Sequence, residues 1–112
     1  MYFSKYHAKK TTVNGITFDS KSESMRYREL QMLERAGEIK DLQLQVPFEL
    51  IPGETGADGK KLRAIKYVAD FVYTDCRTGK QVVEDKKGFR TPEYKLKKRL
   101  MWHVYGIDIY ET

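Results

Sequence analysis

Two neighbouring apolar segments of this chain carry acidic residues where a buried strand normally carries none. Residues 67–73 place Asp70 among valine, alanine, phenylalanine and tyrosine, and residues 82–88 follow two valines with Glu84, Asp85, Lys86 and Lys87. Segments this rich in valine and aromatic residues predict strands of a buried sheet, where an isolated carboxylate costs roughly several kcal/mol. A divalent cation and a nearby lysine would compensate these acids, and that combination hydrolyses phosphodiesters.

The composition limits the chain to one domain. With 112 residues, 40% of them hydrophobic, the chain can fill one core but not two. Cys76 is the only cysteine, which excludes an internal disulfide and a cysteine-rich zinc site. No apolar run approaches the roughly 20 residues that span a bilayer, and the N-terminus lacks the apolar region of a signal peptide. We therefore expect a single domain over residues 1–112 with a basic N-terminal arm over residues 1–10, a cytoplasmic location and no membrane partner.

Positive charge is concentrated after the second acidic segment. The net charge is +5, and between residues 86 and 99 only Glu93 opposes seven cations, Lys86, Lys87, Arg90, Lys95, Lys97, Lys98 and Arg99. Such a block suits a polyanion, because each phosphate that it neutralises releases counterions. The alternative is the solvated face of a helix, and charge alone does not decide between the two.

The first third of the chain predicts a hairpin followed by a helix. Asn14 and Gly15 tolerate the positive φ angles of a two-residue hairpin turn. Ser20 and Glu23 have the spacing of a capping box, and good helix formers continue to residue 36 before a glycine that suits the C-terminal end. We therefore expect a helix over residues 21–36.

Three strands are expected in the middle of the chain. Residues 39–51 alternate as a strand near a sheet edge, bent or bulged at Pro47. Residues 52–61 are rich in glycine and predict a flexible hairpin tip, long enough to drape over a ligand. Residues 64–74 and 81–87 predict two antiparallel neighbours joined by a short turn.

A second helix and a short strand complete the domain. Thr91 before Pro92 is a good helix start, and Gly106 ends the helix after Tyr105. The helix would pack through three apolar residues at four-residue intervals, Leu96, Leu100 and Val104. With a final strand over residues 107–110, the order is helix, three strands, helix and strand after an N-terminal hairpin, which predicts a mixed α/β domain.

Pairing the two acidic strands creates a single site. A hairpin between them brings Asp70 close to the acids of the second strand, and two carboxylates about 4 Å apart repel by roughly 4 kcal/mol at an effective dielectric of about 20. Carboxylate oxygens suit Mg²⁺ or Mn²⁺, whereas zinc would normally need His or Cys ligands. Because side chains alternate along a strand, Glu84 and Lys86 share one face while Asp85 and Lys87 share the other, and both registers remain open.

Each of these acids also has a purely structural interpretation. Asp70 would sit at a strand end and pair with Arg63 or Arg90. The acids of the second strand would belong to an exposed edge strand with mixed charges, and Glu23 would only complete a capping box.

The chain resembles the PD-(D/E)xK nuclease superfamily over residues 16–110. The resemblance lies in the helix that begins at residues 20–23 (Ser-Lys-Ser-Glu), the strand at residues 69–71 (Ala-Asp-Phe), the strand at residues 84–88 (Glu-Asp-Lys-Lys-Gly) and the basic helix after them. It is similar in particular to small bacteriophage nucleases of the endonuclease I type, which resolve Holliday junctions. The resemblance implies a restriction-endonuclease-like core with a mixed central sheet, and a bacteriophage protein acting in the cytoplasm of its host.

The resemblance also assigns roles to residues. It implies that Asp70 and Asp85 bind the metal, that Glu23 completes the acidic cluster, and that Lys87 orients or helps deprotonate the attacking water. This register is chosen because a glycine follows the lysine, as in the family pattern, and Glu84 with Lys86 is the alternative. Two departures from the pattern are an alanine in place of the usual proline before Asp70, and a lysine as the spacer.

The expected function is a magnesium- or manganese-dependent endodeoxyribonuclease, and the resemblance implies branched DNA such as a Holliday junction or fork as its substrate. The residues expected to contact DNA are Lys86, Arg90, Thr91, Lys95, Lys98 and Arg99. One small domain builds one site, so coordinated cutting of two strands would need a homodimer. The main alternative is a non-catalytic nucleic-acid-binding protein of phage replication or recombination, and a further one is an accessory protein that binds a protein partner through an apolar patch.

Overall fold

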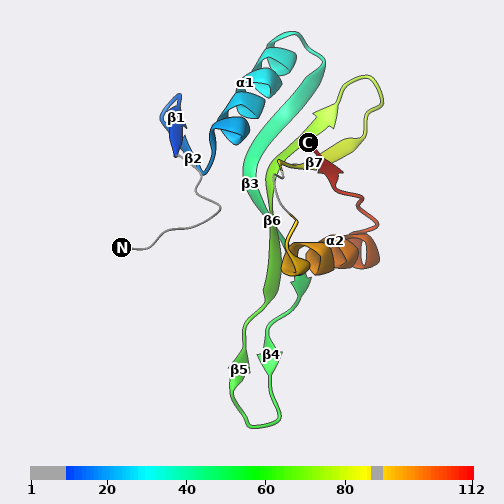
Figure 1. The fold of residues 1–112 in the computed structure, drawn as a ribbon. Helices are drawn as coiled ribbons and strands as arrows, with labels where there is room; N and C mark the ends of the chain where they lie inside the picture. Colours follow the sequence, from blue (N-terminus) through cyan, green and yellow to red (C-terminus); the bar gives the residue numbers. More distant parts are fainter. Residues whose placement is uncertain (1–9, 87–89) are drawn as a thin grey trace.

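A mixed central sheet with two helices forms the domain in the computed structural model, which describes residues 10–86 and 90–112 (Figure 1). The first elements are β1 (Thr11–Val13), β2 (Ile16–Phe18), α1 (Lys21–Arg35) and β3 (Ile39–Ile51). They are followed by β4 (Glu54–Thr55), β5 (Lys61–Leu62), β6 (Ile65–Asp75), β7 (Gln81–Asp85), α2 (Pro92–Tyr105) and β8 (Tyr110–Glu111). The expected mixed α/β class is confirmed.

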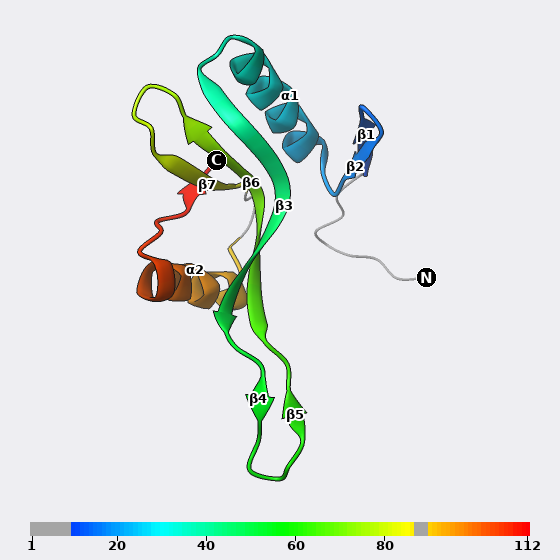
Figure 2. The same cartoon turned by 180° about the vertical axis from the view of Figure 1, so that it is seen from behind.

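The central sheet has the strand order β3-β6-β7-β8. β6 is antiparallel to both β3 and β7, whereas β8 is parallel to β7, and β3 lies at an edge as expected. Phe71 packs with α1 through Leu30, and its neighbour Val72 packs with α2 through Met101. Because adjacent strand residues point to opposite faces, the two helices cover opposite faces of the sheet, as the two views of the fold show (Figures 1 and 2).

The helix boundaries follow the local signals in the sequence. Ser20 Oγ accepts a hydrogen bond from the Glu23 N–H at 3.1 Å, and Thr91 Oγ1 accepts one from the Tyr94 N–H at 3.0 Å. Each bond satisfies an N–H group of the first helical turn that has no partner within the helix. α2 ends at Gly106, which has the left-handed φ of +66° that the end of a helix favours. The expected helix starts and ends are confirmed to within one residue.

The bend or bulge expected at Pro47 is absent, and the register shifts of β3 lie between Lys40 and Gln43 and between Glu49 and Ile51. The alternation of side chains between the two faces of the sheet breaks instead at Gln45 in β3 and at Asp70 in β6. Pro47 keeps a regular register with β6, whereas Gln45 has a left-handed φ of +52°. Leu44 packs with the α1 cluster and Val46 with the α2 cluster, although two residues apart on a regular strand share a face. Phe71 and Ala69, which pair with them, are divided in the same way.

This change of face explains how β6 can carry an acid at its centre. Asp70 lies opposite Gln45 in the β3–β6 register, between one segment that packs on α1 and another that packs on α2. The side chain is therefore only half-buried and belongs to neither core. Simple alternation, which places Val68 and Val72 on one face, is wrong for this strand, because Val68 is 46% exposed and Val72 is buried.

The left-handed conformation of Gln45 predicts that glycine is more stable than alanine at this position, the reverse of the usual order in a strand. A left-handed φ costs a residue with a Cβ atom about 1 to 2 kcal/mol, so we expect Gln45→Gly to be more stable than Gln45→Ala by about 1 kcal/mol. Gln43 pairs regularly with Val72 and is the matched control, where alanine should be more stable than glycine by roughly 0.5 to 1 kcal/mol. Urea unfolding of the four variants measures both differences, and the same order at both positions would contradict the strained conformation.

α2 packs through a different face from the one expected. Tyr94 and Met101 are buried against the sheet, whereas Leu96 is 60% exposed and Val104 is 44% exposed. Leu100 is partly buried against the α2 cluster. The helix is rotated because an aromatic ring and a methionine fill more of the core, and because the Tyr94 hydroxyl reaches a partner on β8.

The final strand also differs from the expectation, because it comprises Tyr110–Glu111 and not residues 107–110. The Ile107 N–H donates to the Met101 carbonyl at 3.3 Å and so belongs to the end of α2. The expected hairpin tip over residues 52–61 lies in the small hairpin β4–β5, which spans residues 54–62 and extends beyond both helices (Figure 2). No helix in residues 10–86 or 90–112 has the length and hydropathy needed to cross a membrane.

Candidate functional site

Three acidic side chains from three elements meet where the sheet changes face. Phe71 pairs with Glu84, so the same register places Asp70 opposite Asp85, and the Asp85 carboxyl group raises the pKa of Asp70. Glu23, in the first turn of α1, is close enough for its charge to act on Asp70. The structure thus brings together the three acids that the sequence selected.

Gln45 connects two of these acids. Its Nε2 donates to Glu23 Oε1 at 3.3 Å and to Asp70 Oδ1 at 3.4 Å. Sequence reasoning missed this residue, because an exposed glutamine in an alternating strand carries no signal of function. Its role depends on the left-handed φ, which only the structure reveals.

The electrostatics of the site favour a positive ligand. Burial raises the pKa of Asp70, the charges of Asp85 and Glu23 raise it further, and the value reaches about 7. The opposing contribution is the Lys86 N–H, which donates to Asp70 Oδ2 at 2.8 Å. Near neutral pH the ionised form of Asp70 is therefore disfavoured in this cluster.

Asp85 is held from the sheet side by a tyrosine that the sequence did not single out. The Tyr67 hydroxyl donates to Asp85 Oδ2, and the carboxylate is only 1% exposed. Burial, together with the hydrogen bond to Asp85, raises the pKa of Tyr67. The phenol therefore stays protonated and fixes the orientation of the Asp85 carboxyl group.

Glu84, the alternative to Asp85, lies on the other face of β7 in a structural ion pair. Its two carboxylate oxygens accept from Arg26 Nε at 2.7 Å and Arg26 Nη2 at 2.9 Å, and Tyr73 donates a further hydrogen bond at 2.8 Å. Glu84 is fully buried in this arrangement. Of the two lysines that follow, Lys86 contributes its backbone to the acidic cluster, and Lys87 lies outside the described residues.

Two of the cations expected to contact DNA are paired with an acid that the sequence analysis did not consider. Arg90 Nη2 and Lys98 Nζ lie 2.5 Å and 3.3 Å from Glu111 Oε1, and Tyr94 donates to Glu111 Oε2 at 2.6 Å. Partial burial pushes the pKa of Glu111 upwards, but the hydrogen bonds and the nearby cations outweigh it and the pKa is lowered. Lys95 and Arg99 are exposed, and Thr91 caps α2.

A comparison with models of protein families identifies the family of this chain. A family model described as a protein of unknown function, DUF1064, matches residues 3–109. The chain belongs to the DUF1064 family. Searches of the curated proteins and of the solved structures find no match.

The acids of this DUF1064 protein do not form a ready-made cage for a metal. Among the residues that the structure describes, no three His, Cys, Asp or Glu side chains are arranged so that they could hold an ion. Mg²⁺ in nucleotide and phosphate sites is commonly bound by one or two carboxylates, with waters and substrate phosphates completing its octahedron. Asp70 and Asp85 are two carboxyl groups on adjacent strands, with Glu23 nearby.

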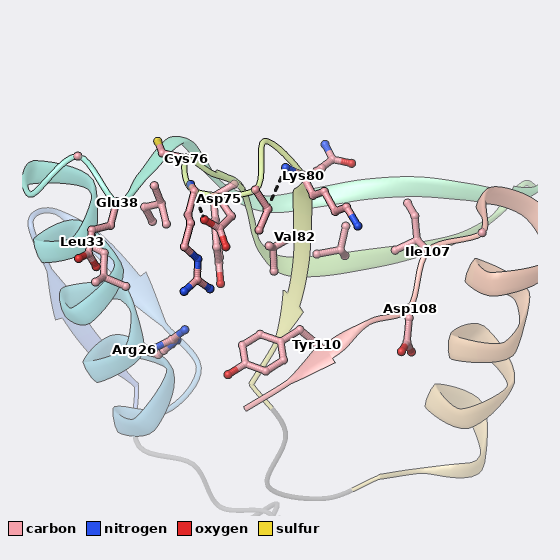
Figure 3. A pocket seen from close by; sticks show the side chains of 18 residues that line it. Arg26, Leu33, Glu38, Asp75, Cys76, Lys80, Val82, Ile107, Asp108 and Tyr110 are labelled. Atoms are coloured by element: carbon pink, nitrogen blue, oxygen red, sulfur yellow. Dashed lines mark hydrogen bonds between the residues drawn. The ribbon is translucent and has the colours of Figure 1, made fainter.

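A cavity of this DUF1064 domain lies away from the three acids. It has a volume of about 1050 Å³ and lies between α1, the β6–β7 turn and the segment that leads to β8 (Figure 3). Arg26, Val82 and Tyr110 are among its lining residues, and none of the three clustered acids is. The acidic cluster is therefore separate from this cavity, and in it Glu23 and Asp85 are buried while Asp70 is half-buried.

Proposed function

We propose that this chain is a metal-dependent endodeoxyribonuclease of the PD-(D/E)xK superfamily. The observation that carries the proposal is that Asp70 and Asp85 lie opposite each other on adjacent strands, with Gln45 bonded to both Asp70 and Glu23. Two carboxyl groups held together on adjacent strands, with the pKa of one raised to about 7, are favourable only if a cation or a proton joins them.

In this proposal each residue of the site has a separate role in phosphodiester hydrolysis. Asp70 and Asp85 would hold Mg²⁺ or Mn²⁺, and Glu23 would add negative charge at the edge of the site. The metal, when bound, supplies positive charge next to the scissile phosphate and lowers the pKa of a bound water. Tyr67 keeps Asp85 oriented, and Lys87 would contact the attacking water or the phosphate.

The arrangement of elements supports the same assignment. The acids lie on two antiparallel strands and on the helix that precedes them, and a basic helix follows the second strand. We assign this arrangement to the restriction-endonuclease-like core. Exposed Lys95 and Arg99 on α2 would contact the DNA backbone, with the backbone of Thr91 at the helix N-terminus.

The substrate we propose is branched DNA, such as a Holliday junction or a replication fork, in a bacteriophage setting. One domain contains one acidic cluster, so symmetric cutting of two strands requires a second copy of the chain. A homodimer is therefore part of the proposal.

A nicking assay with two isosteric variants tests the function. We expect the purified protein to cut labelled junction or flap DNA with Mg²⁺ or Mn²⁺ and to be inactive in EDTA. Asp85→Asn should reduce the rate at least about 100-fold, because it removes a charge that faces the metal. Glu84→Gln, the matched control on the next residue, should keep most of the activity, because Glu84 is bound to Arg26 on the other face.

Two outcomes would contradict the proposal in different ways. A wild-type protein that binds DNA in EDTA but leaves every substrate uncut with both metals is a non-catalytic nucleic-acid-binding protein. If Asp85→Asn is fully active and Glu84→Gln is inactive, the chain is still a nuclease, but Glu84 and not Asp85 is the second metal-binding acid.

A further inference from the structure

The β4–β5 hairpin extends the β3–β6 ladder into an arm that no helix covers. We define the arm as residues 51–66, and in both views of the fold it projects beyond α1 and α2 (Figures 1 and 2). Its aliphatic residues are exposed, with Leu62 at 50% and Ile65 at 44%. A two-stranded ribbon of this kind buries little of its own surface, so the arm has a face available to a partner.

One strand of the arm is positively charged along its whole length. Four exposed cations lie within seven residues and no acid separates them, Lys60, Lys61, Arg63 and Lys66. The acids of the arm, Glu54 and Asp58, belong to the β4 side and to the turn. The β5 edge of the arm is therefore the edge that would attract a polyanion.

The arm continues along the chain into β6, the strand that carries Asp70 of the acidic cluster. Lys66 precedes Asp70 by four residues and Lys61 precedes it by nine, so at about 3.3 Å per residue they lie roughly 13 Å and 30 Å along the path from Asp70. One turn of B-form DNA is about 34 Å long. A duplex with its scissile phosphate at Asp70 could therefore meet the arm cations over about one turn.

We propose that the arm binds the duplex that flanks the cleavage point, through phosphates up to about one helical turn away. This inference rests on the proposed function, because it takes the acidic cluster as the point where the DNA is cut. It adds a length requirement for the substrate: a flank shorter than about seven base pairs ends before it reaches Arg63, Lys61 and Lys60.

The proposal is tested by comparing wild type and an arm variant with fewer charges, each on a junction with long arms and on one with short arms. Fluorescence anisotropy in EDTA would measure binding of four-way junctions with arms of about 6 or about 16 base pairs, closed by short loops. The variant combines Lys60→Gln, Lys61→Gln and Arg63→Gln. We expect it to bind the long junction about 10-fold or more weakly, to lower the salt slope by about 2 to 3, and to bind the short junction within about twofold of wild type.

A control with the same change in charge separates the arm from general attraction. Arg28→Gln, Arg35→Gln and Lys80→Gln remove three exposed cations from α1 and the β6–β7 turn, at the other end of the domain (Figure 1). This control should weaken binding equally for both junctions. Equal losses on both lengths in the arm variant, or no loss at all, would overturn the proposal, and the latter would leave the arm to a protein partner.

The binding measurement and the cleavage measurement fail independently. If the arm variant loses affinity for the long junction only, but the wild type cuts nothing with Mg²⁺ or Mn²⁺, the arm is a DNA contact of a non-catalytic protein. If the wild type cuts DNA but the arm variant loses affinity equally for both junctions, or not at all, the nuclease proposal stands and the arm proposal is wrong.

Discussion

Replacing Arg26 by methionine should destabilise the chain by about 3 to 5 kcal/mol. Arg26 bonds both carboxylate oxygens of Glu84, which is fully buried, and the bidentate contact strongly raises the pKa of the guanidinium. Without Arg26 the buried carboxylate keeps the hydroxyls of Tyr73 and Thr112 but loses its cation. The free energy of unfolding from urea titrations at neutral pH measures the loss.

Two further variants separate the ion pair from the loss of packing. Arg26→Met combined with Glu84→Gln should recover about 1 to 3 kcal/mol, because a neutral amide no longer needs the cation. Arg28→Met, an exposed arginine on the same helix, should change stability by less than about 0.5 kcal/mol. A cost for Arg26→Met as small as that of Arg28→Met would show that Glu84 does not depend on the pair.

The elements of the fold were predictable because their signals are local. The Asn14-Gly15 turn, the caps at Ser20 and Thr91, and the helix stop at Gly106 each act within a few residues, and the structure has all of them. Such signals come from backbone geometry and short hydrogen bonds, which tertiary packing does not need to supply.

The face of each element was less predictable, because it depends on what packs against it. A regular apolar stripe is formed by Leu96, Leu100 and Val104. The residues of α2 that are buried against the sheet are nevertheless Tyr94 and Met101. The alternation of β6 breaks at Asp70 because Gln45, on a different strand, adopts a left-handed φ. No periodicity within residues 64–74 contains that information.

The acids of the candidate site were predictable from the sequence, but their hydrogen-bond and ion-pair partners were not. Asp70 and Asp85 stood out because apolar strands seldom contain acids, and the hairpin between them fixed their proximity. The partner of Glu84 is 58 residues away in the chain, so sequence spacing could not show that Arg26 occupies it. Gln45, Tyr67 and Glu111 were missed for the same reason, since each acts through a contact between elements.

Asp70→Asn should make the metal-free protein more stable while it removes nuclease activity. The folded-state pKa of Asp70 is raised from 3.8 to about 7, so above about pH 7 the ionised side chain costs on the order of 2 to 4 kcal/mol, reduced by its partial exposure to solvent. Asparagine lacks this charge at every pH. At pH 8.5 in EDTA we expect the variant to be the more stable protein, and its cutting rate to fall at least about 100-fold.

The pH dependence gives the sign of the effect. Because the folded state binds the Asp70 proton more tightly than the unfolded state does, wild-type stability falls as the pH rises from about 4 to about 7, and the penalty is complete above that range. The difference between Asp70→Asn and wild type should therefore approach zero near pH 4. Asp108→Asn, which removes the charge of an exposed aspartate, is the matched control.

Metal addition should reverse the stability order at high pH. A cation held by Asp70 and Asp85 stabilises the folded wild type by mass action, and the Asn variant gains less because it has lost one ligand charge. Thermal melts at pH 8.5 with increasing Mn²⁺ should then raise the wild-type midpoint past that of Asp70→Asn. A wild type that is more stable than the variant in EDTA at pH 8.5, and unchanged by Mn²⁺, would mean that Asp70 is stabilised by a structural partner and that the acidic cluster exists to hold the fold together.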